Sequence, residues 1–340
     1  MGIEYSVRPF DGEIARAYLD LFPEDRDRKQ EALLHWRFGD TPQGRGQFGL
    51  AVDDGRIVGM IGLIPVALQA GRDTRPAFQA VDTIVDPAYR GRGLFGGMGT
   101  EIQNHPEVHG AEVLWGFPNA SAARGWFGRM AWDNFGEVPF LFRPLQAGYF
   151  LKRAISALGR VKLPLYFGRG EPNRQIDRLD QRAQSLVDAF AARFAVGQRR
   201  SVEWLNWRLF DKPAGDYRVY THGDRDIDAL LAVAYREKHG GRVLYVMEAM
   251  SKPSADDALK AMIEAELGQA TRSGCDVALA WAPPGAPNRA ILRSAGLVTL
   301  PRKLRPIELN FGARLMTDNA PAAAREGENW YLSYLDSDTV

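Results

Sequence analysis

One stretch, residues 81–98, limits the fold more than any other part of the chain. Its β-branched run over 81–85 predicts a strand, and the turn formers Asp86-Pro87 end that strand. An apolar helical spacing begins at Phe95, so Arg90-Gly91-Arg92-Gly93 forms a loop between the strand and a helix. Glycines let consecutive N–H groups point inward, and a helix N-terminus adds partial positive charge. The stretch therefore predicts a binding site for an anion such as a pyrophosphate.

The order Arg90-x-x-Gly93 after a Val-x-Pro turn resembles the acyl-CoA signature of the GNAT acetyltransferase superfamily, Gln/Arg-x-x-Gly-x-Gly/Ala. Here Phe95 takes the sixth position and Gly96 follows it. The resemblance implies that the pyrophosphate is held by Arg90, Gly91, Arg92, Gly93, Leu94, Phe95 and Gly96. It also implies that the preceding strand contacts the pantetheine and the thioester through Thr83, Ile84 and Val85. Asn119, at the start of a later helix, resembles the superfamily asparagine that holds the pantetheine arm, and it equally suits a helix N-cap.

Two other interpretations of the loop stay open at this point. Gly91-x-Gly93-x-x-Gly96 also fits the dinucleotide fingerprint, which is weak by itself. In that fold the strand runs directly into the first glycine, whereas Asp86 to Arg90 intervene here. The second alternative is a glycine-rich surface turn without a ligand. A P-loop is excluded, because no Gly-Lys-Ser/Thr follows the glycines.

The second half of the chain repeats the order of elements in the first. Asn206-Trp-Arg208 matches His35-Trp-Arg37, and the two tryptophans are 171 residues apart. In the second copy, Ser254-x-x-Asp257 predicts a capping box for a helix with one apolar face, formed by Leu259, Met262, Ile263 and Leu267. No Arg-x-x-Gly precedes that helix, so the second copy is not expected to bind CoA.

The repeat predicts two copies of one α/β fold, each a central mixed β-sheet flanked by helices. The resemblance implies tandem GNAT-like domains, in which the second half completes the fold and shapes the acceptor site. We expect a first domain over residues 1–145, a linker over 146–171, and a second, degenerate domain over 172–340.

Composition excludes several classes of function. The 340 residues carry 43 Lys and Arg against 42 Asp and Glu, and no basic run predicts a nucleic-acid partner. The longest apolar run, residues 57–68, is too short to span a bilayer, so no membrane partner is expected. A single cysteine, Cys275, and an N-terminus without an apolar core predict a cytoplasmic protein. The five histidines do not form a metal set, so no metal is expected. His105 and His109 have helical spacing, but Pro106 breaks the helix between them.

Acyl transfer from a thioester needs a base for the amine and an acid or other stabilisation for the departing thiolate. Asp82, in the strand before the loop, is the first candidate base. Some tandem relatives use their terminal carboxylate, so the Val340 carboxylate is a second candidate base. Asp336 and Asp338, which follow a predicted final strand over 330–335, are further candidates. The resemblance places the usual tyrosine acid at Phe127, beside Trp126. Neither ring can donate that proton, so the acid stays unassigned.

These observations favour an acyl-CoA-dependent N-acyltransferase, most simply an N-acetyltransferase, that uses acetyl-CoA as cosubstrate by direct transfer in a ternary complex. The acceptor would be a small amine, such as an amino sugar or an amino acid, and the protein a monomer or a homodimer. Two alternatives are an aminoacyl transferase of the tandem cell-wall type and a catalytically dead CoA-binding sensor or scaffold.

Overall fold

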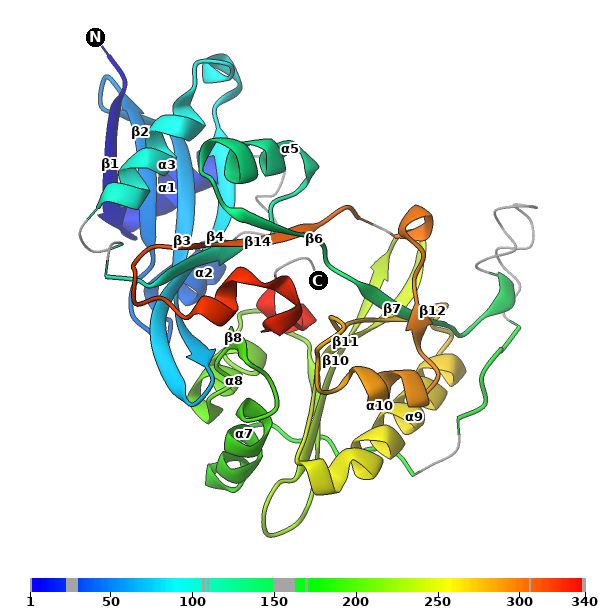
Figure 1. The fold of residues 1–340 in the computed structure, drawn as a ribbon. Helices are drawn as coiled ribbons and strands as arrows, with labels where there is room; N and C mark the ends of the chain where they lie inside the picture. Colours follow the sequence, from blue (N-terminus) through cyan, green and yellow to red (C-terminus); the bar gives the residue numbers. More distant parts are fainter. Residues whose placement is uncertain are drawn as a thin grey trace. The chain divides into compact units, whose positions relative to one another are not determined.

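The computed structural model describes residues 2–22, 30–105, 108, 110–148, 163–168, 171–305 and 307–337. The chain forms two compact units (Figure 1). Unit 1 comprises Met1–Glu137, Asp211–Pro213 and Glu308–Asn329; unit 2 comprises Val138–Phe210, Ala214–Ile307 and Trp330–Val340. Each contains a mixed sheet flanked by helices, as the repeat predicts. No helix of the described ranges is long and apolar enough to cross a membrane.

Unit 1 is built on one twisted sheet with the strand order β1-β2-β3-β4-β5-β14-β6. Its elements are β1 (Glu4–Pro9), α1 (Gly12–Leu21), α2 (Glu31–Leu34), β2 (Gln47–Asp53), β3 (Arg56–Ala70), β4 (Asp73–Val85), α3 (Leu94–Asn104), β5 (Val113–Gly116), α5 (Ala120–Ala123), β6 (Asp133–Glu137) and β14 (Asn310–Leu315). The helix α1 begins after Asp11, and an aspartate directly before apolar residues of helical spacing predicts an N-cap there. The cap is confirmed, because the carboxylate of Asp11 accepts from the N–H of Ile14. Among the described residues, neighbouring strands in this order are antiparallel except for β4 and β5, which are parallel. The strand that enters the glycine loop therefore does not belong to a parallel nucleotide-binding sheet, and the dinucleotide interpretation is wrong.

The helix α3 covers the sheet of unit 1 with its apolar side. Leu94, Met98 and Ile102 are at most 2% exposed and join the side chains of β3 and the aromatic ring of Trp126 in one core. This burial, and not the weak helix propensity of a segment with three glycines, holds α3 in place. The end of the loop is fixed in turn, because Leu94 is the first residue of the helix.

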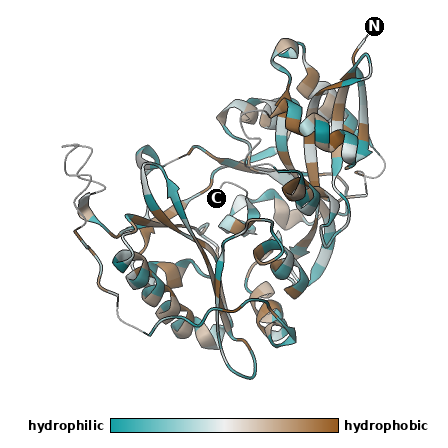
Figure 2. Cartoon of the chain, turned by 180° about the vertical axis from the view of Figure 1, so that it is seen from behind, coloured by the Kyte–Doolittle hydropathy of each residue, from teal (hydrophilic) through white to brown (hydrophobic). Residues whose placement is uncertain are grey.

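Unit 2 contains a six-stranded sheet with the order β13-β7-β12-β11-β10-β9. Its elements are β7 (Phe140–Pro144), α7 (Gln184–Ala191), β8 (Val196–Gln198), α8 (Val202–Leu209), β9 (Arg218–His222), β10 (Ala229–Lys238), β11 (Gly241–Ser251), α9 (Asp256–Arg272), β12 (Val277–Trp281), α10 (Arg289–Ser294), β13 (Val298–Thr299) and β15 (Trp330–Tyr331). The predicted apolar face of α9 is buried, and hydrophobic residues concentrate along the strands of both units (Figure 2). The predicted capping box is wrong, since α9 follows Ala255 and no side chain caps it.

The strands β7 and β14 each pair with strands from the other half of the chain. The strand β7 precedes residue 145 but pairs with β12 and β13 of unit 2. The strand β14 comes from the second half but lies between β5 and β6 of unit 1 (Figure 1). The contiguous domains expected over 1–145 and 172–340 therefore do not coincide with the compact units, because local patterns do not specify which sheet a strand joins. Most of the expected linker lies outside the described residues.

The chain near its C-terminal end is anchored in the core of unit 2. The guanidinium of Arg200 contacts Glu248 at 2.9 Å and Asp336 at 2.6 Å, and all three side chains are at most 1% exposed. The predicted final strand is shorter than expected: β15 ends at Tyr331 and a 3-10 turn, Tyr334–Asp336, follows. Asp336 is thus part of a buried ion-pair network rather than a frayed tail. Asp338 and Val340 lie outside the described residues.

Candidate functional site

The bend between β4 and α3 has the backbone geometry that its glycines permit. Asp86 accepts a hydrogen bond from the N–H of Ala88 and starts a short 3-10 turn, Pro87–Tyr89. Gly91 and Gly93 then have φ of 79° and 81°. This left-handed conformation is accessible to glycine and costs other residues about 1–2 kcal/mol. The two glycines are therefore required by the turn that brings the chain into α3.

The bend presents a row of main-chain donors. In the described part of the chain, no protein oxygen accepts a hydrogen bond from the N–H groups of residues 91–95. The N–H groups of Gly96 and Gly97, by contrast, bond the carbonyl of Gly93 and close the first turn of α3. Gly96 therefore does not supply a free donor, and the row ends at Phe95. Residues 90–93 are exposed, so the row is open to a ligand at the positive end of the helix.

Three arginines surround this row. The Nε of Arg90 donates to the carbonyl of Val85 at 3.3 Å, and the guanidinium of Arg92 lies 4.9 Å from the ring centre of Tyr89. Arg129 comes from the end of a π-helix, Arg124–Arg129, and its Nη1 lies 2.6 Å from the position of a Cβ at Gly96. Glycine at 96 thus makes room for this guanidinium.

Arg129 was not among the residues predicted from the sequence. It lies more than thirty residues from the loop, and nothing in the segment around it resembles an anion site. Its Nη1 is also only 3.7 Å from the position of a Cβ at Gly93. Tertiary packing therefore places the guanidinium of Arg129 at the N-terminus of α3, and the local sequence does not predict this position.

The strand before the bend separates from its neighbour. Among the described residues, the ladder between β4 and β5 ends at the pair Ala80 and Gly116, while β4 continues to Val85. On the other side, the register with β3 shifts, so that Asp82 and Thr83 lie between the pairs at Val81 and Ile84. This is a β-bulge. The open edge along the last residues of β4 lies on the other side, where β5 no longer pairs with it.

Asp82 is at the centre of this bulge. Its φ is 47°, an uncommon conformation for an aspartate. One carboxylate oxygen accepts hydrogen bonds from the hydroxyl of Tyr18 at 2.5 Å and from Arg37 at 2.6 Å. Tyr18 is fully buried in α1, and Arg37 belongs to the π-helix His35–Gly39. The predicted base is therefore also the residue that ties the strained bulge to two helical segments.

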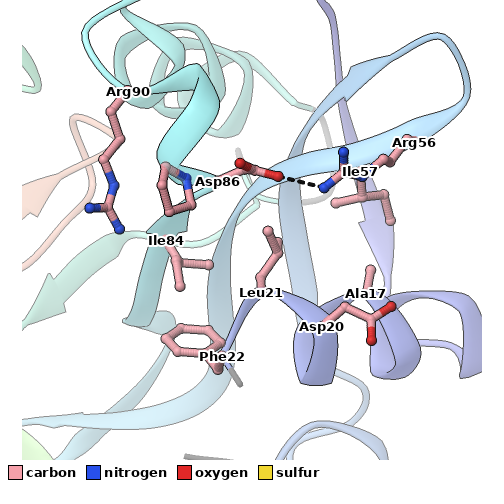
Figure 3. A pocket seen from close by; sticks show the side chains of 10 residues that line it. Ala17, Asp20, Leu21, Phe22, Arg56, Ile57, Ile84, Asp86 and Arg90 are labelled. Atoms are coloured by element: carbon pink, nitrogen blue, oxygen red, sulfur yellow. Dashed lines mark hydrogen bonds and ion pairs between the residues drawn. The ribbon is translucent and has the colours of Figure 1, made fainter. Parts of the chain in front are cut away.

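A pocket of about 370 Å³ opens beside the same strand end (Figure 3). Its floor is apolar, with Ile57 and Ile84 from adjacent strands and Phe22 after the end of α1. Its rim holds the ion pair of Arg56 and Asp86 at 2.5 Å, with Arg90 on the opposite side (Figure 3). Two of the predicted cofactor residues, Ile84 and Arg90, thus line a cavity next to the bend.

The other predicted residues have structural contacts of their own. The Oδ1 of Asn119 accepts from the N–H of Ala122 at 3.0 Å, so Asn119 is the N-cap of α5. Leu94 is buried and contributes its main chain, while Phe95 packs edge-on against Trp126. Trp126 also contacts Trp132 at 4.4 Å between ring centres. Phe127, at the position of the usual tyrosine, is partly buried and packs against the same core.

Comparison with known proteins identifies the family of this segment. Residues 15–133 match the sequence model of the acetyltransferase (GNAT) domain. The chain carries a GNAT acetyltransferase domain. The match covers the β4 strand, the glycine bend and the segment with Arg129, but not the second half of the chain. No curated protein matches this sequence.

Solved structures match the fold over both units of the chain. A GCN5-related N-acetyltransferase from Anabaena variabilis ATCC 29413 matches with a TM-score of 0.66 at 12% identity, over 95% of this chain and 75% of that chain. The N-myristoyltransferase of Saccharomyces cerevisiae, solved with myristoyl-CoA, matches with a TM-score of 0.61 at 14% identity, over 93% and 80%. A probable N-acyltransferase from Enterococcus faecalis V583 gives 0.61 at 11%, over 92% and 73%. At these identities the likeness establishes the fold alone.

The bend of unit 2 that corresponds to the glycine loop of the GNAT domain contains a carboxylate of its own. Asp256 and Asp257 lie in the first turn of α9. Arg193 contacts both carboxylate oxygens of Asp256, at 2.7 and 2.9 Å, and the hydroxyl of Ser251 donates to the same group at 2.5 Å. The first turn of α9 is therefore occupied by an internal ion pair, and the expectation that this copy binds no CoA stays a prediction.

Proposed function

We propose that this protein is an acyl-CoA-dependent N-acyltransferase, most simply an N-acetyltransferase, that binds its donor at the bend between β4 and α3. The supporting observation is the row of main-chain N–H groups at residues 91–95, which begins at the exposed residues 91–93 and is flanked by Arg90, Arg92 and Arg129. Consecutive amides at a helix N-terminus with added arginines suit a diphosphate. The loop identified from the sequence is thus the proposed pyrophosphate site.

The open edge of β4 gives the pantetheine arm a place beside the sheet. Its amides would pair with main-chain groups of Thr83 and Val85 where β5 no longer does. The thioester would then lie near the bulge at Asp82, where a main-chain N–H can polarise its carbonyl. Backbone groups would both hold the pantetheine arm and polarise the thioester carbonyl, so donor binding would depend on the bulge and not on a particular side chain.

Transfer would be direct. The neutral amine nitrogen attacks the thioester carbon, the tetrahedral intermediate collapses, the C–S bond breaks, and the products are the amide and CoA thiol. One proton leaves the amine and one reaches the sulfur. Asp82 remains the described candidate for the first proton, with Asp338 and the Val340 carboxylate as candidates outside the described residues. No residue is assigned to the second proton, because Trp126 and Phe127 lack a suitable donor.

Two measurements test the proposal. Calorimetric titration with acetyl-CoA should show one site per chain, and thiol release from acetyl-CoA in the presence of a panel of small amines should identify the acceptor. Absence of acetyl-CoA binding contradicts the donor site and favours the aminoacyl-transfer alternative, which needs no CoA loop. Tight binding without thiol release for any amine favours the sensor, which the aromatic residues at the acid position also suit. A cytoplasmic location fits the buried free thiol of Cys275.

A further inference from the structure

The bulge of β4 has a backbone conformation that its surroundings must maintain. Asp82 has φ of 47°, and such conformations of residues other than glycine persist where the surrounding structure imposes them, often at functional sites. The register with β3 shifts at this point, from the pair of Gly62 and Val81 to the pair of Met60 and Ile84. The contacts that fix Asp82 therefore also fix the direction of the main-chain N–H groups in the bulge.

Arg37 is the cation that holds this aspartate. Its Nη1 lies 2.6 Å from Oδ2 of Asp82, and the two side chains are 9% and 17% exposed. The hydroxyl of Tyr18, a fully buried residue of α1, donates to the same oxygen at 2.5 Å. Short hydrogen bonds to a charged group are strong, and more so away from bulk water. The two donors therefore fix the carboxylate from the side of the sheet that α1 covers.

The helical turn that carries this arginine packs beside the bulge. It is the π-helix His35–Gly39, and π-helical turns are frequent at functional sites. Phe38 of this turn is fully buried and contacts the rings of Phe10 and Phe48, at 5.7 and 4.7 Å between ring centres. A Cβ at Gly62 would lie 3.2 Å from the ring of Phe38, so the turn packs directly on β3 at the shift of register. The core thus sets the position of the guanidinium.

Unit 2 contains a similar grouping in a sealed form. In β11, which corresponds to β4 in the repeat, Glu248 lies at the shift of register with β10. It accepts hydrogen bonds from Arg200 and from the hydroxyl of Tyr331, and all three residues are at most 1% exposed. A carboxylate held by an arginine and a tyrosine thus accompanies the bulge in both units. Of the two groupings, the one at Asp82 is partly exposed and lies in the strand that leads into the glycine bend.

We propose that Arg37 is a positioning residue for acyl transfer, because it holds Asp82 and thereby fixes the N–H groups of the bulge beside the thioester. This inference rests on the proposed function of the site in unit 1. An N–H group stabilises the tetrahedral intermediate best when it already points to the place where negative charge develops. A displacement of about 1 Å can lower the rate about 100-fold. The diphosphate would be held separately, at residues 91–95, so Arg37 should affect the rate far more than the affinity for CoA.

The first test compares Arg37→Gln, which removes the charge, with Arg37→Lys, which keeps it. In steady-state assays of thiol release with an amine acceptor, Arg37→Gln should lower kcat about 10- to 100-fold, and Arg37→Lys should restore part of the loss. The Kd for CoA, measured by calorimetry, should stay within about two-fold of the wild type, because the lost interaction acts in the transition state. Tyr18→Phe, which removes one hydroxyl, should lower kcat less than Arg37→Gln does.

The second test measures the bulge itself without an assay of activity. Hydrogen exchange of the main-chain amides of residues 81–85 should be faster in Arg37→Gln than in the wild type, since the bulge opens more often. Arg193→Gln is the matched control: this arginine pairs with Asp256 in unit 2, and its side chain is 19% exposed. The control should lose a similar amount of stability in thermal unfolding, while its kcat and its exchange at residues 81–85 stay unchanged.

Four results would overturn the proposal. They are a folded Arg37→Gln variant with the kcat of the wild type, unchanged exchange at residues 81–85, an equal loss of kcat in Arg193→Gln, and a loss of CoA affinity as large as the loss of kcat. If Arg37→Gln does not fold, Tyr18→Phe and Arg37→Lys carry the same comparison. A wild type that neither binds acetyl-CoA nor releases thiol contradicts the proposed function, and the role of Arg37 in transfer falls with it. Failure of the positioning role alone leaves an active wild type.

Discussion

Replacing Gly93 with glutamate should weaken donor binding by placing a negative charge where the diphosphate is expected. Gly93 has φ of 81°, so any L-residue there loses about 1–2 kcal/mol of stability through backbone strain. The larger effect is electrostatic. At about 5 Å, a carboxylate and one phosphate charge repel by about 1 kcal/mol at the dielectric constant of water and about 3 kcal/mol at an effective value of 20. A loss of about 1–3 kcal/mol corresponds to a Kd about 5- to 150-fold higher.

The assay is calorimetric titration with acetyl-CoA, with thermal unfolding measured in parallel. Gly274→Glu is the matched control, because Gly274 also has φ of 81° and no atom lies within 4 Å of the position that a Cβ would take there, but it follows α9 in unit 2. Both variants should lose similar stability, and only Gly93→Glu should lose affinity. Equal affinity of Gly93→Glu and wild type would refute the site, and equal loss in both variants would show that global destabilisation explains the effect.

Three further predictions concern other residues. Arg129→Gln should raise the Kd for acetyl-CoA about 5- to 30-fold and reduce the salt dependence of binding, because one charge-assisted contact is lost. The control is Arg72→Gln, at an exposed arginine in the β3–β4 turn, which should change neither quantity. Unchanged binding by Arg129→Gln would remove Arg129 from the site. Asp82→Asn should lower kcat. It should also lower the free energy of unfolding by about 1–3 kcal/mol, because it weakens the contacts with Tyr18 and Arg37. A fully active variant would exclude Asp82 as the base. Burial alone would raise the pKa of Asp256, but hydrogen bonds from Arg193 and Ser251 outweigh it and lower that pKa below its ordinary 3.8. The ionised carboxylate of Asp256 therefore stabilises the fold fully above about pH 4, and this contribution is lost as the pH falls through the pKa of the folded state. Asp256→Asn should flatten the decrease of the unfolding temperature in this acidic range. An unchanged profile would contradict a stabilising role of the ionised Asp256.

The parts of the fold that sequence predicted well depend on neighbouring residues. The strand, glycine bend and helix around residues 81–98 follow from the local order of β-branched, turn-forming and apolar residues. The same is true of the Asp11 cap and of the apolar face of α9. Each of these features is decided within a few residues, where periodicity and turn chemistry are reliable guides.

The features that sequence did not predict depend on contacts between distant segments. The strand β7 pairs with β12, and β14 pairs with β5, each with a strand from the other half of the chain. The edges of both sheets present the same main-chain donors and acceptors, so the sequence around a strand does not show which sheet it joins. Arg129 reaches the bend only because the core around Trp126 packs its helical segment against α3. The burial of Asp336 depends on Arg200, more than a hundred residues earlier in the chain. No local pattern contains these pairings.

The most direct test of the central claim is a crystal structure of the protein with acetyl-CoA. We expect diphosphate oxygens within about 3.2 Å of the main-chain nitrogens of residues 91–95, with the guanidinium of Arg129 beside them. A donor bound elsewhere, or a bend whose N–H groups contact only protein or water in the complex, would contradict it.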